Sequence, residues 1–369
     1  MIDSRIPIKK RIALDLHSLK KSVDTRLHEL RYLFWECTLR CNLSCIHCGS
    51  DCFRDAGLKD MPLADFLRVV DSIIDRVTPQ KTIIAITGGE PLMRGDLETC
   101  GHELYKRNFP WGMVTNGFGL NRQRYEKLLD AGLRSLTISL DGMRASHDWF
   151  RGTTGSFDRA LKAIELAART DNIIFDVASC THRRNFAELS KMREILVNSG
   201  VKRWRLFTVF PKGRAMGNDD LKLSDRQFIE LMEFIVETKR QGALQANYGC
   251  EGFLGAYEGA ARENLFMCLA GISVGSVLID GSISACPSLR ADYVQGNIYR
   301  DDFWDVWNNR FQKMRDRRWT KTGKCASCKV YKWCQGNGLH LRDEKTGDLL
   351  VCHYEKLAGG RPEITHAIN

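Results

Sequence analysis

The chain alternates between short apolar runs and longer stretches in which apolar residues recur every three or four positions. The short runs predict six strands, at residues 32–36, 82–87, 112–115, 135–140, 173–178 and 205–210. Residues 83–86 and 136–140 are almost continuously apolar, which is typical of parallel strands covered on both faces. This pattern predicts an α/β fold built on a parallel sheet.

Amphipathic helices are predicted between these strands. The first carries one apolar stripe, formed by Phe66, Val69, Val70, Ile73, Ile74 and Val77. Similar patterns cover residues 96–107, 121–131, 156–169, 185–198 and 224–239. Six strand–helix repeats are too few for a closed eight-stranded barrel, which takes about 250 residues. We therefore expect a partial (β/α)6 TIM-type barrel with right-handed crossovers and a site at the carboxyl ends of its strands.

After about residue 236 the alternation stops, and cysteine and glycine become more frequent. We expect three parts: a basic N-terminal extension over 1–30 with a weak helical pattern, a barrel over 31–235, and a loop-rich domain over 236–369. One amphipathic helix is predicted near 302–314 in the last part. Its thin apolar core indicates that bound metal stabilises it.

Composition narrows the function classes. No apolar run approaches the roughly 20 residues of a membrane helix, and residues 1–16 lack the apolar segment of a secretory signal. Fourteen cysteines without such a signal indicate metal ligands in a reducing cytoplasm. The net charge is +10, but the basic run at 313–318 lacks interleaved aromatics, so we expect a solvated helix face, no nucleic acid and no membrane partner.

Three cysteines follow the first predicted strand as Cys41-x3-Cys45-x2-Cys48. Three close thiolates can bind three irons of a [4Fe–4S] cube and leave the fourth iron open for chemistry. The alternative is a zinc site, since cytosolic C-x2-C pairs are frequent zinc ligands. In that case the chain would be a zinc-binding interaction protein.

This spacing resembles the signature of the radical S-adenosylmethionine (SAM) enzymes. The resemblance implies that the open iron chelates SAM and that His47 lies near the adenine. Gly88, Gly89 and Glu90 resemble the family's GGE motif for the SAM amino group. Further SAM contacts implied by position are Asn116 at the ribose, Ser139 and Asp141 in the Ser-x-Asp-Gly motif, and Arg151 at the carboxylate. Asn116 could instead cap a helix, and Asp141 could order a turn.

The chemistry implied is reductive. An electron from a reduced flavodoxin- or ferredoxin-type donor would cleave SAM to methionine and a 5′-deoxyadenosyl radical, which takes hydrogen from the substrate. The protein positions the reactants and excludes water.

The later cysteines resemble the SPASM extension, which holds auxiliary iron–sulfur clusters. By this resemblance Cys325, Cys328, Cys334 and Cys352 ligate the second auxiliary cluster. Cys268 and Cys286 belong to the first, but Gly338 stands where the family has another cysteine. Cys250 or His340 could supply that ligand, or the site could be a [2Fe–2S] cluster or have an open iron. The other cysteines, Cys37, Cys52, Cys100 and Cys180, are expected to be structural.

SPASM enzymes mostly modify ribosomally made peptides or proteins, so peptide maturation is the leading hypothesis. The alternative is a small-molecule substrate of the tetrapyrrole or nucleoside type. Formylglycine formation is disfavoured, because Pro287 stands where sulfatase-maturing relatives carry an aspartate.

Overall fold

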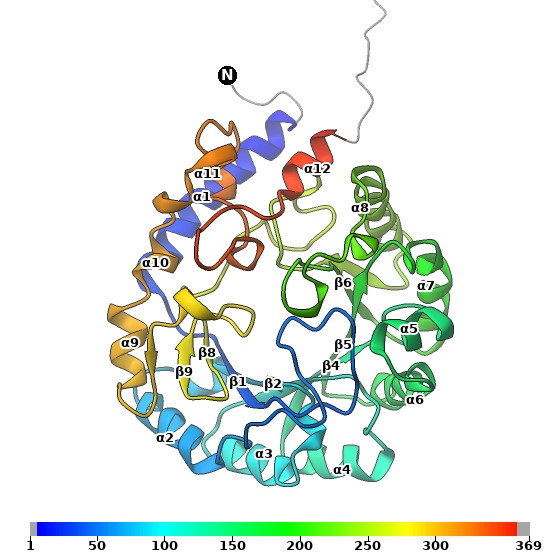
Figure 1. Ribbon diagram of the computed structural model, residues 1–369, viewed down its shortest axis with the longest axis vertical. Helices are drawn as coiled ribbons and strands as arrows, with labels where there is room; N and C mark the ends of the chain where they lie inside the picture. The colour runs from blue at the N-terminus through cyan, green and yellow to red at the C-terminus, as the bar shows by residue number, and fades with distance from the viewer. Residues whose placement is uncertain (1–5, 360–369) are drawn as a thin grey trace, which may run out of the picture.

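The computed structural model describes residues 6–359 (Figure 1). Their ten strands form one sheet in the order β10-β9-β8-β1-β2-β3-β4-β5-β6-β7. The strands are β1 (Tyr32–Thr38), β2 (Ile83–Gly88), β3 (Trp111–Thr115), β4 (Leu133–Ser139), β5 (Ile174–Thr181), β6 (Arg203–Thr208), β7 (Gln245–Tyr248), β8 (Val274–Val277), β9 (Ser282–Ser284) and β10 (Gly296–Asn297).

The helices lie around this sheet, and α2 to α8 cover the outside of its barrel (Figure 1). They are α1 (Ile8–Leu27), α2 (Leu63–Ile73), α3 (Leu97–Lys106), α4 (Arg122–Asp130), α5 (Arg144–Arg151), α6 (Ser156–Ala168), α7 (Leu189–Asn198), α8 (Asp225–Arg240), α9 (Phe303–Asn309), α10 (Gln312–Arg315), α11 (Tyr331–Cys334) and α12 (His353–Gly359). None of the helices between residues 6 and 359 is long and apolar enough to cross a membrane.

The six predicted strands correspond to β1–β6, and all neighbouring pairs from β1 to β7 are parallel. The strand residues that face the helices are apolar, and Leu33, Ile84, Leu136 and Val177 are fully buried. Trp35 stacks on Phe66 of α2 at 4.4 Å between ring centroids. This packing confirms the partial (β/α)6 barrel.

The sheet does not end where the barrel was expected to end. β7 adds a seventh parallel strand, and β8 returns to pair in parallel with β1, matching Tyr32 with Val274 and Trp35 with Val277. The expected boundary at residue 236 falls inside α8. Strand pairing therefore joins the C-terminal part to the barrel.

The N-terminal extension forms α1, which starts earlier than the weak pattern indicates and packs along the C-terminal part beside α11 (Figure 1). Lys21 is buried and donates to the Trp333 carbonyl at 2.6 Å. The carboxylate of Asp15 accepts from Lys332 and from the Trp333 indole, both at 2.7 Å. Polar contacts therefore attach this helix.

Candidate functional site

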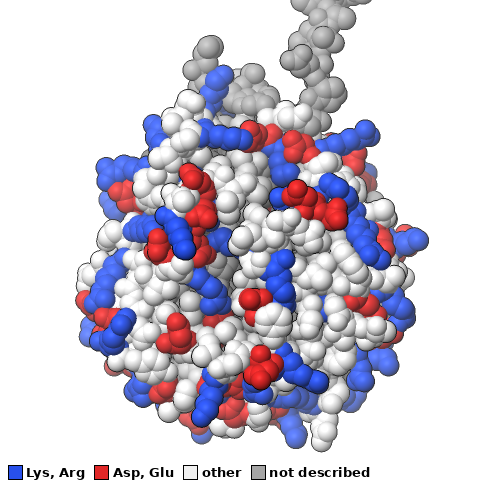
Figure 2. All heavy atoms as spheres, viewed as in Figure 1, with Lys and Arg blue, Asp and Glu red and all other residues white. Residues whose placement is uncertain are grey.

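The three cysteines after β1 line one cavity of about 280 Å³ at the carboxyl ends of the barrel strands. A hollow near the centre of the face in Figure 2 has acidic and basic side chains at its rim. Cys41, Cys45 and Cys48 pack together with Cys52. Residues 6–359 contain no group of three or more His, Cys, Asp or Glu side chains placed around one ion. In a cubane each thiolate would bind a different iron.

The two glycines of the GGE motif let β2 cross close to the start of the cysteine loop. The Gly89 amide donates to the Thr38 carbonyl at 2.7 Å, and the Glu90 amide donates to the Arg40 carbonyl at 2.9 Å. Gly88 has φ +139°, and a Cβ on either glycine would collide with these carbonyls. The glycines are thus required to fix the cysteine loop against β2.

Glu90 is buried, and its carboxylate binds the protein itself. It accepts from the Thr115 hydroxyl at 2.7 Å, from the Asn116 amide at 2.8 Å and from the Leu92 amide at 3.1 Å. Burial raises the pKa of Glu90. The carboxylate lines the cavity but primarily positions the end of β3.

Asn116 connects that strand end to the cysteine loop. Its Nδ2 donates to Asn42 Oδ1 at 2.8 Å and lies 3.9 Å from Cys41 Sγ, while its Oδ1 accepts from the Phe118 amide at 2.9 Å. Asn116 therefore lies beside the predicted cluster and orders the turn after β3.

Arg151 and Asp141 form a buried pair on the other side of the cysteines. Arg151 Nε donates to Asp141 Oδ2 at 2.6 Å, and Arg151 Nη1 lies 3.7 Å from Cys45 Sγ. Burial opposes ionisation of both groups, but the charge of each partner favours ionisation of the other. As a result, the pKa of Asp141 is lowered and the pKa of Arg151 is raised. Ser139 and Arg151 line the cavity, whereas Asp141 lies behind Arg151.

His47 stacks on Phe150 of α5, with 3.8 Å between ring centroids and 2° between planes. Its Nδ1 is buried without a hydrogen-bond partner. Burial, aided by Arg151, lowers the pKa of His47 to about 3. The site therefore offers a neutral aromatic ring with an unused nitrogen, which fits the predicted adenine position.

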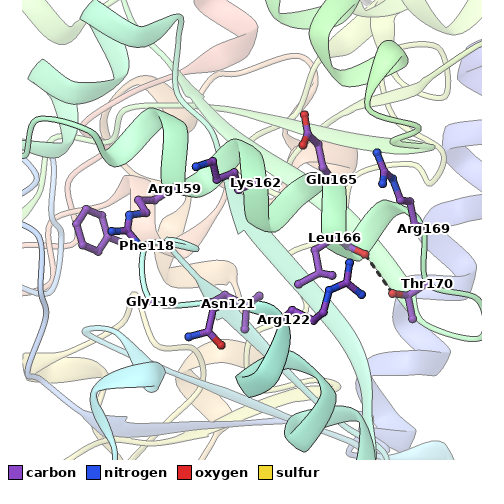
Figure 3. A pocket seen from close by; sticks show the side chains of 11 residues that line it. Phe118, Gly119, Asn121, Arg122, Arg159, Lys162, Glu165, Leu166, Arg169 and Thr170 are labelled. Carbon is purple, nitrogen blue, oxygen red and sulfur yellow. Dashed lines mark hydrogen bonds between the residues drawn. The ribbon is translucent and has the colours of Figure 1, made fainter.

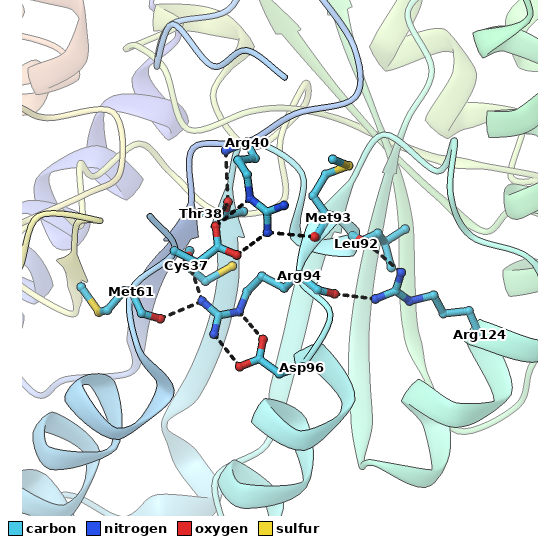
Figure 4. A network of polar contacts seen from close by, with 10 residues as sticks. Cys37, Thr38, Arg40, Met61, Leu92, Met93, Arg94, Asp96 and Arg124 are labelled. Carbon is cyan, nitrogen blue, oxygen red and sulfur yellow. Dashed lines mark hydrogen bonds and ion pairs between the residues drawn. The ribbon is translucent and has the colours of Figure 1, made fainter. Parts of the chain in front are cut away.

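A buried arginine network fixes the base of the cysteine loop (Figure 4). Arg94 is 2% exposed, donates to the carbonyls of Cys37 and Met61 at 2.8 Å, and pairs with Asp96. Arg124 donates to the Arg94 carbonyl at 2.8 Å. Cys37 itself is buried in the core, as expected of a structural cysteine.

The C-terminal cysteines fall into two groups. Burial raises the pKa of Cys334 to about 12, and the charges of Cys352, Cys325 and Cys328 act on the same thiol. Burial likewise raises the pKa of Cys286 to about 12, with Cys250 and Cys268 adding to it. These neighbours agree with the two predicted ligand sets.

Cys250 and His340 both lie near the gap in the first of these sets. A Cβ on Gly338 would collide with the Glu251 carbonyl and with the His340 ring, while of the two only Cys250 acts electrostatically on Cys286. The His340 ring lies 4.9 Å from that of Phe210, and burial, Lys212 and Arg317 lower the pKa of His340 to about 3. No cysteine is among its charged neighbours.

The mouth of the cavity carries side chains that were not predicted. They are Phe210, Lys212, Arg214, Ser288, Arg290 and Glu344. The first three follow β6, and the last three come from the C-terminal part. In the sequence, only the position of the first three directly after a strand could have indicated a place at the site.

A larger cavity of about 730 Å³ lies between α4 and α6, with Phe118 at the end nearest the cysteine loop (Figure 3). Arg122, Arg159, Lys162 and Arg169 line it, with Glu165 as its acidic residue. It holds none of the predicted site residues.

Two family models match the chain. The model of the radical SAM superfamily matches residues 35–194, and that of the iron–sulfur cluster-binding SPASM domain matches residues 268–329. The chain belongs to the radical SAM superfamily. It is a radical SAM/SPASM enzyme.

Curated relatives cover most of the chain. An AdoMet-dependent heme synthase of Methanosarcina barkeri is 29% identical over 326 residues, covering 83% of this chain and 90% of the relative. The mycofactocin maturase MftC of Mycobacterium tuberculosis is 29% identical over 312 residues, covering 82% and 77%. One of these relatives is thus named as a heme synthase and the other as a maturase.

Solved structures share the fold. SuiB of Streptococcus suis bound to S-adenosylmethionine aligns with TM-score 0.67 at 18% identity, covering 87% of this chain and 77% of that one. The anSMEcpe structure with bound AdoMet gives TM-score 0.67 at 18% identity, covering 89% and 94%.

The radical SAM domain binds a [4Fe–4S] cluster and SAM, and the SPASM domain binds additional iron–sulfur clusters. The residues here fit these groups. Three thiols share one cavity, the Arg151 guanidinium points at it, and His47 has a free buried nitrogen. We predict that Cys41, Cys45 and Cys48 hold the cluster and that Arg151, Asn116 and His47 hold SAM.

Proposed function

We propose that this enzyme modifies a ribosomally made peptide or protein. When bound, the cluster and SAM supply the radical chemistry that removes a hydrogen atom from the substrate. The chain's own residues position the substrate in the cavity mouth and exclude water.

The charge balance of the cavity mouth carries this proposal. Lys212 Nζ pairs with Glu344 at 2.6 Å, and the two side chains are only 15% and 16% exposed. Arg290 pairs with Glu36, which is 1% exposed. Since these cations already have carboxylate partners, the mouth favours a largely uncharged group over a polyanion.

The rim of the cavity also offers groups that suit a peptide. Ser288 at the rim and the Glu344 carboxylate can hydrogen-bond peptide amides.

A tetrapyrrole is the second candidate, because the heme synthase of Methanosarcina barkeri aligns over 90% of its length. Propionate groups would then have to displace Glu344 from Lys212 or Glu36 from Arg290.

The experiment offers both substrate classes to the anaerobically reconstituted enzyme. Candidate peptides encoded beside the gene, deuterated at each residue type in turn, are compared with iron-coproporphyrin III. We expect 5′-deoxyadenosine carrying deuterium and a mass change in one peptide. Turnover of the porphyrin alone would overturn the proposal.

We propose further that a flavodoxin- or ferredoxin-type donor docks on the basic groove between α4 and α6. Arg159, Lys162 and Arg169 are exposed and have no ion-pair partner within residues 6–359. Donors of this class are acidic, so charge would steer them to this groove.

One end of the groove reaches the predicted cluster. The Arg159 guanidinium lies 5.5 Å from the centroid of the Phe118 ring (Figure 3). Phe118 packs against the cysteines of the loop and donates its amide to Asn116, which lies beside Cys41. An electron arriving at Phe118 therefore has a short, packed route inward.

Charge reversal tests the docking site. Arg159→Glu with Lys162→Glu should slow flavodoxin-driven SAM cleavage about tenfold, while cleavage driven by dithionite stays unchanged. Arg226→Glu with Arg240→Glu, exposed on α8, is the matched control. Equal rates for the two double variants with flavodoxin would place the donor elsewhere.

A further inference from the structure

The N-terminal helix α1 carries an apolar stripe that faces away from the protein. Its members are Ile8, Ile12, Leu16, Leu19, Val23 and Leu27. They are between 42% and 69% exposed. Spaced by three or four residues, they form a continuous row along one side of a helix about 30 Å long. Such contiguous apolar patches mark interaction sites.

The side of α1 that faces the protein is mostly polar and carries one buried apolar residue, Leu14, which packs in a cluster with Phe253 and Phe266. Lys21 donates to the Trp333 carbonyl at 2.6 Å, and the His17 ring lies 3.3 Å from the Phe266 carbonyl. Asp15 is held by Lys332 and Trp333. Rotation of the helix to bury the stripe would break these contacts, so within residues 6–359 the stripe stays uncovered.

The charged residues of α1 indicate which kind of partner covers the apolar stripe. The helix carries six basic and two acidic residues. Both acids have partners, Asp15 with Lys332 and Asp24 with Lys20. Lys9 and Arg26 are exposed near the two ends of the stripe and have no carboxylate partner between residues 6 and 359.

A second copy of the chain fits this pattern poorly. Both ends of α1 are basic, so two such helices would bring like charges together in either orientation. An anionic lipid surface accepts the apolar row and the flanking cations together.

We propose that α1 rests in the plane of an anionic membrane surface, with the stripe in the boundary between headgroups and acyl chains. This proposal departs from the expectation of no membrane partner, which rested on the lack of an apolar run long enough to span a membrane. This inference is independent of the substrate, because it concerns the face of α1 and not the cavity.

Flotation of the full-length enzyme with vesicles tests the proposal. Binding is expected to vesicles of phosphatidylcholine mixed with phosphatidylglycerol and to be much weaker with phosphatidylcholine alone. Leu16→Glu with Leu19→Glu should weaken binding at least about a hundredfold. Lys9→Ala with Arg26→Ala should weaken it about thirtyfold, because each basic residue near an anionic surface contributes about fivefold.

Val197→Glu, at a 37% exposed position of α7, is the matched control and should bind like the wild type. Dithionite-driven SAM cleavage should be equal in all variants, which shows that each is folded and leaves the proposed function untouched. Failure of the wild type to float, or flotation of the Leu16→Glu/Leu19→Glu variant, would overturn the proposal. A stable dimer that this variant dissociates would also overturn it, because a second copy would then cover the stripe.

Discussion

Buried arginines hold loops in both the barrel and the C-terminal part, as Arg94 and Arg342 do, but the two parts differ in the core that supports those loops. In the barrel, apolar strands such as those containing Ile84 and Leu136 form the core, and the site residues sit on the strand ends. The C-terminal part has short strands, and buried charged side chains bind its backbone. Arg342 is 1% exposed and donates to the carbonyls of Gly336, Gly347 and Thr320 at 2.8, 2.7 and 3.0 Å.

The difference follows from what each part must position. A sheet satisfies its own backbone, so its side chains are free to form a core. A loop that wraps a metal cluster has no such ladder, and a guanidinium with five donors can bind several carbonyls at once. Glu258 does the converse, accepting from the amides of Leu254 and Phe266 at 2.8 Å.

The largest effect should come from removing one predicted ligand in each part. Cys41→Ala should abolish reductive SAM cleavage, since the SAM-binding cluster would lose a thiolate. Cys328→Ala should spare that cleavage but stop turnover of the substrate. Both are measured as 5′-deoxyadenosine and product under dithionite. If the Cys328 variant formed product normally, the auxiliary cluster would have only a structural role.

Replacing Arg342 by methionine should lower the free energy of unfolding by about 4 kcal/mol, because two buried carbonyls and one half-buried carbonyl lose their donor. Denaturant titration measures it, and hydrogen exchange should localise the loss to the C-terminal part. Arg318→Met is the control: its side chain is 91% exposed, and the titration should show no resolvable change. Similar losses from the two variants would refute the comparison.

Lowering the pH should destabilise the barrel, because His147 is buried in its neutral form. Burial lowers the pKa of His147 to about 4, and its Nδ1 accepts from the Asp141 amide at 3.0 Å. The unfolded chain takes up this proton near pH 6.5, so the stabilisation is full above that pH and is lost as pH falls toward 4. Between pH 7 and 5 this amounts to about 2 kcal/mol. His147→Gln should remove that share of the pH dependence in urea unfolding, and an unchanged dependence would contradict the assignment.

The smallest effect is expected on the outer surface of the barrel. Arg122 and Glu126 are 3.8 Å apart, with side chains 74% and 60% exposed. Glu126→Ala should change the free energy of unfolding by less than about 0.5 kcal/mol. A larger loss would mean that surface pairs, and not the apolar core, stabilise this half.

Sequence patterns were sufficient where one physical rule acts alone. The strand over 83–86 is predictable because a strand covered on both faces must be apolar, and Gly88 and Gly89 because backbone crosses backbone there. β7 escaped prediction because it is an edge strand with only Ala246 and Tyr248 buried. The cavity mouth escaped it because Lys212 and Glu344 lie 132 positions apart. Long-range ion pairs leave no local pattern.

The return of β8 to β1 also has a consequence for how the protein is made. Until residue 277 has left the ribosome, β1 has a bare edge on one side, with the Cys41 loop attached to its end. Such an edge invites pairing with other chains. Closure across more than 240 residues of intervening chain is slow. A nascent chain stalled before β8 is therefore the species most in need of a chaperone.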